Sequence, residues 1–230
     1  MPLILALETS TARGGAALIQ DATLVAEASY QRSKGHAETL HPLLEQLLEQ
    51  SQVKTEQIDA VAVSFGPGAF TALRVGLATA KGLAYALAKP LIGLDTLEVM
   101  CCNIPHGDRL LVPLIDARKN EVCGAIFRRK QNGELTVVQK QFTLKAAELA
   151  KLLTKPKPKM ILFGPGARLY QRTFSRQLGT KADFLGPLYD YPQASALAYL
   201  ALNQYKKKRF TDPFTAVPVY LRPSEADSKS

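Results

Sequence analysis

Residues 64–82, SFGPGAFTALRVGLATAKG, decide the fold, because a strand end, a glycine turn and a helix follow one another within this stretch. The apolar residues 60–63 directly before it are typical of a buried strand. Pro67 presets one turn angle and Gly68 can adopt a positive φ, so the chain is expected to turn sharply here. Thr71 is then expected to cap a helix with one broad apolar face.

This strand, turn and helix have two interpretations. Free backbone N–H groups and the helix dipole would meet at the turn, and both favour an anion such as a phosphate. Alternatively, Gly66 and Gly68 only permit close packing between the strand and the helix, as glycine turns before helices often do. For the turn by itself we favour the packing interpretation.

The composition indicates a globular protein. At 230 residues, the chain can form one large domain or two small ones. No apolar run reaches the roughly 20 residues that a membrane span needs, and the first residues lack the basic start of a signal peptide. Three cysteines without paired metal spacing, Cys101, Cys102 and Cys123, fit reduced thiols. We therefore expect a cytoplasmic protein with no membrane partner.

The formal net charge of +9 favours an anionic partner, and RNA is the obvious candidate. The basic runs at residues 128–130 and 206–209 are the candidate contacts. Charge runs are more often solvated faces, and the chain lacks an RNA-binding motif rich in aromatic residues. We therefore do not favour independent nucleic-acid binding by the chain.

The tetrapeptide Gly-Pro-Gly-Ala occurs twice, at residues 66–69 and 164–167, each time after an apolar run. Residues 112–118 likewise repeat the N-terminal apolar strand and its acidic end. Signals that recur in the same order predict two related α/β halves. The expected division of the chain is 1–106, 107–223 and a disordered tail at 224–230.

Glu8, Thr9 and Ser10 end the first predicted strand, and Asp116 ends its repeat. Short side chains at such a connection let a phosphate approach the backbone, and Glu8 could hold a magnesium ion through water. A plain hairpin with a solvated carboxylate is the simpler interpretation, and without more context we favour it.

The remaining segments predict ordinary elements. Asp95 and Thr96 are expected to cap a short helix with Glu98 in its first turn. Pro42 is expected in the first turn of a helix, with irregular residues before it. Other patterns predict strands at 24–30 and 91–94, helices at 36–50, 142–153 and 193–207, a hairpin turn at Asn132 and Gly133, and an extended segment at 218–223.

One dense leucine stripe runs along the helix predicted at residues 36–50. Burial of each leucine is worth roughly 1.5–3 kcal/mol, so this face must pack against something. The pattern does not distinguish the protein's own core from a helix of a partner. His36 and His41 are five residues apart and do not share a helix face, so we interpret both as surface or capping groups. The stripe consists of Leu40, Leu43, Leu44, Leu47 and Leu48.

Taken together, these segments resemble the TsaB family of glycoprotease-like proteins over nearly the whole chain. The most specific match is residues 66–76, GPGAFTALRVG. The resemblance implies an actin-like, Hsp70-like, sugar-kinase-like (ASKHA) fold with two related α/β subdomains, which agrees with the internal repeat. The other matching segments are residues 5–10, 81–84, 113–118 and 218–222.

The resemblance also implies a function. TsaB-like proteins belong to the bacterial system that forms N6-threonylcarbamoyladenosine (t6A) at position 37 of tRNAs that read ANN codons. In the related TsaD, two histidines four residues apart hold the catalytic metal, and the matching positions here are Thr96 and Met100. A hydroxyl and a thioether are poor ligands for a hard divalent ion. We therefore expect no catalytic residue, no metal and no required cofactor.

The implied role is that of a scaffold that binds TsaD as a heterodimer, TsaE in a ternary complex, and tRNA through the complex. A homodimer of the chain alone remains open. By resemblance, two helices provide the partner contacts. The residues expected there are Leu40, Leu44, Leu47, Leu48, Ala72, Gly76 and Ala80.

Two other functions are weighed. A degenerate nucleotide site would bind ATP or ADP weakly, but Ala117 and Arg118 fit poorly beside a magnesium–phosphate centre. A peptidase would need a base beside a nucleophile, and the three histidines have no recognisable nucleophile motif near them. The residues of the nucleotide site would be Glu8, Thr9, Ser10, Gly66, Gly68, Asp116, Gly164 and Gly166.

Overall fold

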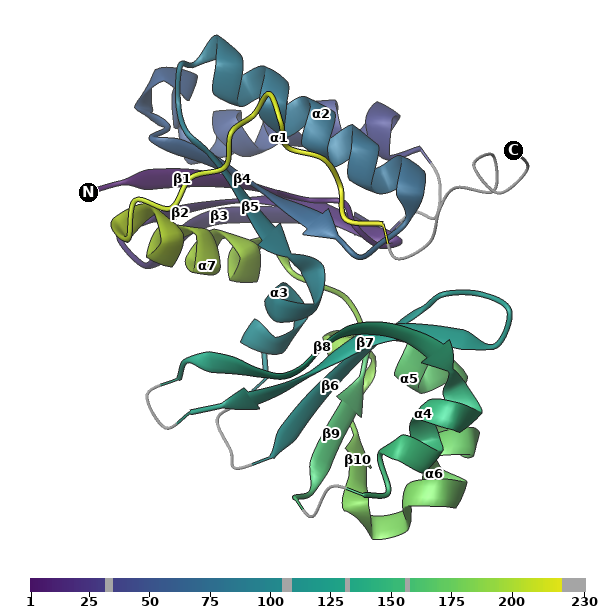
Figure 1. Cartoon of the computed structure of the whole chain (residues 1–230). Coiled ribbons are helices and arrows are strands. Elements are labelled where there is room, and N and C mark those ends of the chain that lie inside the picture. Colours follow the sequence, from purple (N-terminus) through teal and green to yellow (C-terminus); the bar gives the residue numbers. More distant parts are fainter. Residues whose placement is uncertain (32–34, 105–108, 131–132, 156–157, 221–230) are drawn as a thin grey trace. The chain divides into compact units, whose positions relative to one another are not determined.

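The computed structural model describes residues 1–31, 35–104, 109–130, 133–155 and 158–220 (Figure 1). The chain divides into two compact units. Unit 1 combines residues 1–102 with the segment from Pro192 onward, and unit 2 comprises residues 103–191. Each unit is built around its own five-stranded sheet.

The sheet of unit 1 has the strand order β3-β2-β1-β4-β5. β1 pairs antiparallel with β2 and parallel with β4, while β3 and β5 extend the two sides. The strands are β1 (Leu3–Glu8), β2 (Arg13–Gln20), β3 (Thr23–Gln31), β4 (Ala60–Gly66) and β5 (Leu91–Asp95). The strands predicted at residues 24–30 and 91–94 are confirmed, and they form the two outer strands of this sheet, β3 and β5.

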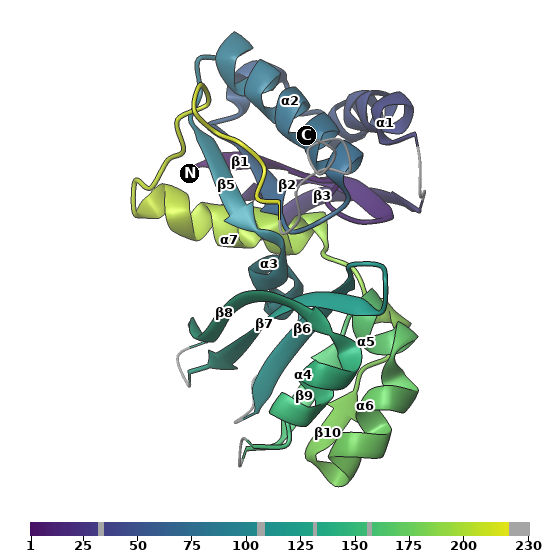
Figure 2. The ribbon, with the colours of Figure 1, turned by 45° about the vertical axis from the view of Figure 1, so that its right-hand side comes forward.

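Helices cover both faces of this sheet. Figures 1 and 2 show α1 and α2 on one face and α7 on the other. Alternate residues of β1 point to the two faces, so that Leu5 joins the core under α1 and α2 whereas Ala6 joins the core under α7. The helices are α1 (His36–Ser51), α2 (Phe70–Ala86), α3 (Thr96–Cys102) and α7 (Ala194–Lys206), with a short 3-10 turn at Thr55–Gln57.

The position of α7 corrects the expected division of the chain. The sequence placed residues 107–223 in one half, but α7 and the segment after it belong to unit 1. Ala198 and Ala201 are fully buried in the same core as Ile4 of β1. Their small side chains allow the helix to lie close to the sheet, and this long-range contact has no local sequence signal. The expected tail, 224–230, lies outside the described residues.

Unit 2 repeats the pairing pattern of unit 1. Its sheet has the order β10-β9-β6-β7-β8, in which β6 pairs antiparallel with β7 and parallel with β9. The strands are β6 (Leu110–Asp116), β7 (Glu121–Arg129), β8 (Leu135–Lys145), β9 (Met160–Phe163) and β10 (Ala182–Phe184). The helices are α4 (Ala146–Leu152), α5 (Pro165–Leu169) and α6 (Gln171–Leu178), with 3-10 turns at Gly179–Lys181 and Pro187–Tyr189.

The repeated Gly-Pro-Gly-Ala segment has the same role in both units. Gly66 and Gly164 both have positive φ angles, 116° and 98°. The second glycine of each segment lies close to the backbone near the end of the first strand of its unit. A β-carbon on Gly68, for example, would lie 2.2 Å from the carbonyl oxygen of Ser10, which follows β1. A β-carbon on Gly166 would lie 2.9 Å from the carbonyl carbon of Ile115. The inferred internal repeat is therefore a repeat of structure.

Three local predictions are wrong. Helix α2 begins at Phe70 with Ala69 as its N-cap, two residues before the expected cap at Thr71. The positive φ at the turn belongs to Gly66 and not to Gly68. Pro42 lies inside α1, whose first residue is His36, so the residues before the proline are helical. Six helical residues precede Pro42, so its missing N–H removes one helical hydrogen bond without ending the helix.

One helix prediction is half wrong. Residues 142–145 continue strand β8, and only the residues from Ala146 onward are helical. Phe142 and Leu144 alternate along the strand and both pack against the core of unit 2. The hairpin between β7 and β8 is confirmed at Gly133, which has a positive φ, whereas Asn132 lies outside the described residues.

Several other predictions are confirmed. The strand predicted at 24–30 is part of β3, and the helix at 193–207 corresponds to α7. Asp95 Oδ1 accepts hydrogen bonds from the backbone N–H groups of Leu97 and Glu98, as expected for a cap of α3. Among the residues that the structure describes, none belongs to a helix with the length and hydropathy of a membrane span.

Candidate functional site

A cluster of buried polar side chains lies where β1 ends in unit 1. Such groups are rarely buried without a structural or functional reason. The sequence pointed to the three consecutive residues at this end, but not to the residues that surround them. The buried members are Glu8, Thr9, Ser10, Thr11, His36 and Ser64, each no more than 6% exposed.

Glu8 is the centre of this cluster. Its Oε1 accepts hydrogen bonds from the Ser10 backbone N–H at 2.7 Å and from the Ser10 hydroxyl at 2.5 Å. Its Oε2 accepts a hydrogen bond from the Ser64 hydroxyl on β4. Burial raises the pKa of Glu8, while these hydrogen bonds act in the opposite direction. The expected solvated carboxylate is therefore wrong: both oxygens already have protein partners.

Thr9 and Ser10 lie directly against the turn and helix that follow β4. The Thr9 hydroxyl donates to the Ala72 carbonyl at 2.8 Å, and the Ala69 N–H donates to the Ser10 carbonyl at 2.8 Å. A β-carbon on Gly76 would lie 2.2 Å from Thr9 Oγ1. The glycines thus permit close approach of the two segments, as the packing interpretation of this turn requires.

Tyr30 and His36 extend the cluster toward the start of α1. The Tyr30 hydroxyl and His36 Nδ1 are 2.9 Å apart, and the two ring centroids are 5.4 Å apart. Burial lowers the pKa of His36, whereas burial and the negative charge of Glu8 raise the pKa of Tyr30 to about 12. His36 is thus a buried group, and its assignment to the surface is wrong.

The sequence carried one signal for the position of Tyr30. Gly14 pairs with Tyr30 across β2 and β3, and a β-carbon on Gly14 would lie 2.4 Å from the tyrosine ring. A glycine in a strand often marks such a close approach. The ring therefore fills the space over the strand and reaches the polar cluster.

The corresponding positions in unit 2 are more open. Asp116 ends β6, and its Oδ1 accepts a hydrogen bond from the Arg118 backbone N–H at 2.9 Å. Asp116 also raises the pKa of Tyr170, after the larger effect of burial. Gly164 and Gly166 lie at the start of α5. The eight residues of the expected nucleotide site are thus divided between the two units, five in unit 1 and three in unit 2.

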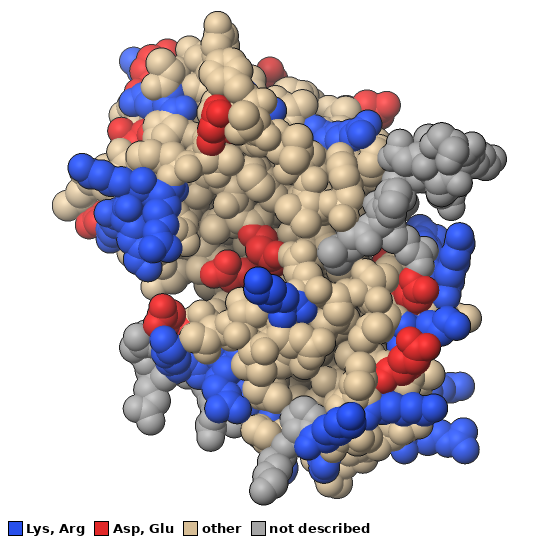
Figure 3. All heavy atoms as spheres, in the orientation of Figure 1, with Lys and Arg blue, Asp and Glu red and all other residues tan. Residues whose placement is uncertain are grey.

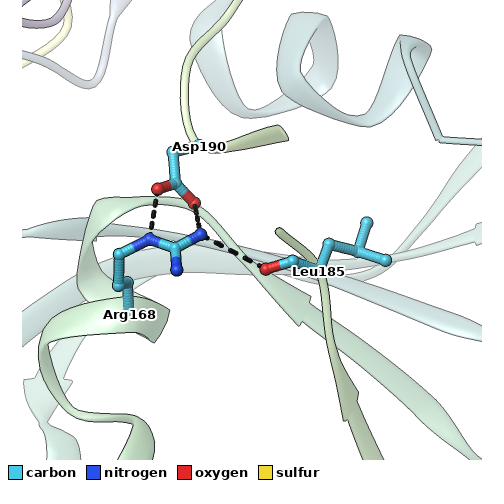
Figure 4. A network of polar contacts seen from close by, with 3 residues as sticks. All are labelled: Arg168, Leu185 and Asp190. Atoms are coloured by element: carbon cyan, nitrogen blue, oxygen red, sulfur yellow. Dashed lines mark hydrogen bonds and ion pairs between the residues drawn. The ribbon is translucent and has the colours of Figure 1, made fainter. Parts of the chain in front are cut away.

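An ion pair fixes the end of unit 2 to α5. Arg168 Nε donates to Asp190 Oδ2 at 2.5 Å, and Nη2 donates to Asp190 Oδ1 at 3.0 Å and to the Leu185 carbonyl at 3.3 Å (Figure 4). The Asp190 side chain is only 7% exposed, so this two-point pairing compensates a buried carboxylate. We interpret this group as structural.

The residues expected to contact a partner lie mostly inside unit 1. Leu40, Leu44 and Leu47 of α1 belong to the core under the sheet. Gly76 faces Thr9, and Ala80 is fully buried in the same core. Ala72 is likewise buried, and Leu48 is only partly exposed. The leucine stripe is therefore covered by the protein's own core, one of the two occupants that the sequence left open.

Thr96 and Met100, which the resemblance matches to two metal-binding histidines of TsaD, lie on α3 and are buried. Thr96 is its first residue, and Met100 follows four residues later. The Thr96 hydroxyl makes no hydrogen bond with any residue that the structure describes, and Met100 is 1% exposed. Neither side chain supplies an imidazole or carboxylate.

Comparisons with known proteins agree with this architecture. A family model described as TsaD, tRNA N6-adenosine threonylcarbamoyltransferase, matches residues 24–229. The tRNA threonylcarbamoyladenosine biosynthesis protein TsaB of Bacillus subtilis is 33% identical over 98% of this chain and 96% of its own. The structure of YeaZ from Pseudomonas aeruginosa matches with a TM-score of 0.81 and 27% identity, over 96% of this chain and 100% of that one.

A more distant structure shows the fold alone. The ethanolamine utilization protein EutJ of Carboxydothermus hydrogenoformans matches with a TM-score of 0.55 and 15% identity, over 86% of this chain and 90% of that one. Two units with the same strand order, each with a glycine turn after the fourth strand of its sheet, define an ASKHA-fold protein. Within that class, the chain belongs to the TsaB and TsaD family of tRNA threonylcarbamoyladenosine biosynthesis proteins.

Proposed function

We propose that this protein is a non-catalytic subunit of the machinery that forms N6-threonylcarbamoyladenosine in tRNA. In this role it binds a TsaD-type transferase as a heterodimer and brings a TsaE-type ATPase into the same complex. The support is the match to TsaB of Bacillus subtilis, which covers nearly the full length of both chains. The function thus rests on the whole fold and not on one motif.

The chemistry at α3 carries the non-catalytic part of the proposal. By resemblance, a TsaD-type enzyme has two metal-binding histidines where this chain has Thr96 and Met100. A catalytic divalent ion prefers imidazole and carboxylate ligands, which a neutral hydroxyl and a thioether do not replace. Met100 is also buried as an apolar side chain. These residues support a subunit that assists a transferase rather than one that carries the metal.

The partner surface is reassigned to the outer face of α2 and the segment that crosses it. We call residues 211–220 the C-terminal strap. The strap is fixed to unit 1 because Lys81 Nζ donates to the Ala216 carbonyl at 3.0 Å and the Val219 N–H donates to the Phe65 carbonyl at 2.7 Å. Thus it presents its remaining side chains from a defined position.

Exposed aromatic side chains gather on this surface. Tyr85 of α2 is 74% exposed and Phe214 of the strap is 79% exposed, with an edge-to-face contact at 6.4 Å between centroids. Arg74 lies 3.9 Å from the centroid of the Phe70 ring and donates to the Tyr220 hydroxyl at 3.0 Å. Tyrosine, phenylalanine and arginine are enriched at protein interfaces. The transferase is therefore proposed to dock here.

The test is copurification with a TsaD-type and a TsaE-type protein, followed by a tRNA modification assay with each component omitted in turn. The proposal predicts a stable complex and loss of modification when this chain is omitted. Turnover of threonylcarbamoyl-adenylate by this chain alone would contradict the non-catalytic assignment. Size measurement of the isolated chain would separate a monomer from a homodimer.

Nucleotide binding stays a prediction that the geometry of unit 1 does not favour. The space beside Gly68 is occupied by the Ser10 backbone, and the Glu8 carboxylate is enclosed by two serines. Calorimetry with ATP and magnesium on the isolated chain tests this alternative directly. Tight binding would favour it over a role in assembly alone.

A further inference from the structure

The net positive charge of this protein resides in one of its two units. Residues 103–191, which form unit 2, contain 16 lysines and arginines and 7 aspartates and glutamates, a net charge of +9. The rest of the chain contains 13 of each kind and is neutral. The entire formal charge of +9 therefore belongs to unit 2. Such an uneven division of charge between the two units indicates that solubility alone does not account for the charge.

Five of these cations lie on one helical surface of unit 2. Three are on α4 and α6, and the other two each lie three residues after the end of one of these helices; α4 and α6 pack against each other. In Figure 3, lysine and arginine side chains gather over the part of unit 2 where Figure 1 labels these two helices. We call this surface the α4–α6 face, and its cations are Lys151, Lys155, Arg172, Arg176 and Lys181.

These five side chains are exposed, and none makes an ion pair with another residue that the structure describes. The acidic residue on the same elements is Glu148, in the first turn of α4. Arg172 and Arg176 are four residues apart on α6. Like charges at this spacing repel each other along a helix, so this pair costs stability. An external anion would relieve this repulsion.

The surface is also held in place. The buried residues Phe174 and Leu178 fix α6 to the core of unit 2, and Leu149 does the same for α4. Lys181 Nζ donates to the Thr154 carbonyl at 2.9 Å, which joins the ends of the two helical segments. The arginines on α6 therefore project from a helix whose other side is fixed.

The other basic runs are better compensated within the protein. In the run at residues 128–130, Lys130 pairs with Glu134 at 2.9 Å and Arg129 donates to the Gly133 carbonyl. The run at residues 206–209 lies on the neutral unit, where Lys207 is close enough to Glu98 to affect its pKa. On the α4–α6 face, by contrast, Lys151, Lys155, Arg172 and Arg176 have no carboxylate partner among the residues that the structure describes.

We propose that the α4–α6 face binds the phosphate backbone of RNA and holds the tRNA substrate on the assembled complex. This inference rests on the proposed function, because that function makes tRNA the available polyanion. Lysine and arginine contacts to phosphates carry no base specificity, so the face positions the RNA and does not read its sequence. An acidic protein bound at the same face is the competing outcome.

The test compares two full-length variants with the same change of charge. The face variant carries Lys151→Ala, Lys155→Ala, Arg172→Ala and Arg176→Ala. The control variant carries Lys206→Ala, Lys207→Ala, Lys208→Ala and Arg209→Ala. Each is assembled with the transferase, and its affinity for an unmodified tRNA is measured by fluorescence anisotropy at several salt concentrations. Circular dichroism melting verifies that both variants fold.

The face variant is expected to bind tRNA at least tenfold more weakly than the unmodified chain. The slope of its plot of log affinity against log salt should become shallower by roughly 2.8–3.6, because each of the four lost phosphate contacts removes about 0.7–0.9 from the slope. The control should change affinity by less than threefold. A third variant with Arg172→Lys and Arg176→Lys should retain most of the binding, because phosphate contact needs charge.

Three results would overturn the inference. Equal losses in the face and control variants would show that only total charge matters. Unchanged tRNA affinity of the face variant would remove RNA as the occupant. Weaker copurification of the face variant with the transferase, at unchanged tRNA affinity, would assign the face to an acidic protein. If the unmodified chain itself fails to copurify, the proposed function fails, whereas tRNA binding by the isolated chain and its variants at low salt still tests the face.

Discussion

Gly68 lies so close to Ser10 that a β-carbon on the glycine would lie 2.2 Å from the serine carbonyl oxygen. The neighbouring Ala69 N–H donates to the same oxygen at 2.8 Å. The turn after β4 and the connection after β1 are therefore in direct backbone contact. Any side chain at Gly68 must separate two segments that position the polar cluster.

The first prediction follows from this contact. Gly68→Ala should destabilise the protein by about 1–3 kcal/mol, because the added methyl group must displace backbone. Gly82→Ala is the matched control, since Gly82 lies in α2 and a β-carbon there meets nothing within 4 Å. It should stabilise the protein by about 0.5–1 kcal/mol. Urea denaturation measures both values, and equal effects would contradict the close contact.

The buried carboxyl group at the centre of the polar cluster should make stability depend on pH. Because burial raises the pKa of Glu8 in the folded state, the folded protein binds this proton more tightly than the unfolded chain. The contribution of this proton to the stability of the folded state is fully present at pH values below the pKa that Glu8 has in the unfolded chain. It is lost as the pH rises through the pKa that Glu8 has in the folded protein. Glu8→Gln should therefore gain stability relative to the unmodified chain as the pH rises.

Urea midpoints measured between pH 4 and pH 8 test this sign. The amide of Gln can still accept from Ser10 and donate toward Ser64, so the geometry of the cluster should persist. Glu45→Gln, at an exposed position of α1, controls for the loss of one carboxylate. A Glu8→Gln variant that loses stability relative to the unmodified chain as the pH rises would show that Glu8 is stabilised in its charged form.

The leucine stripe of α1 should behave as core. Leu44 is 6% exposed and packs under the sheet of unit 1. Leu44→Ala should destabilise the protein by about 2–5 kcal/mol, and Leu44→Asp should prevent folding, because it also buries a charge. Glu45→Ala on the exposed side of the same helix should change stability little. Circular dichroism with urea denaturation distinguishes these outcomes; a folded Leu44→Asp variant would return the stripe to the partner surface.

The exposed aromatic pair should be important for assembly and not for folding. Tyr85→Ala combined with Phe214→Ala should weaken binding to the TsaD-type transferase at least tenfold, because large exposed aromatic groups commonly dominate interface energies. Tyr199→Ala is the control, since Tyr199 is 46% exposed and lies on α7, on the other face of the sheet. Calorimetric titration gives the affinities. A similar loss in the Tyr199 variant would indicate a general effect on unit 1.

Much of this fold could be predicted from local patterns. The apolar run before Gly66, the glycine turn and the helix after it are neighbours in sequence, and their short-range signals agree with one another. The repeated Gly-Pro-Gly-Ala segment predicted two related units, and both sheets have the same order. Local propensity and tertiary packing favour the same structure in these segments.

The sequence could not determine contacts between distant segments. Nothing local to α7 indicates that Ala198 packs near Ile4, almost two hundred residues earlier. The leucine stripe indicated burial, but an amphipathic pattern does not name its partner. The close contact of Tyr30 with His36 was missed for the same reason, although Gly14 left the space that the tyrosine ring fills. In the polar cluster, Glu8 and Ser10 were recognisable as a strand end, whereas Ser64 was not.

The return of α7 to the first sheet has a consequence for synthesis on the ribosome. One face of that sheet stays uncovered until residues 194–206 have emerged, although its five strands are complete by Asp95. The intervening residues 103–191 have a separate core and can fold while the earlier strands wait. A ribosome that stalls within that interval leaves an apolar sheet face exposed, which chaperones or proteases can recognise.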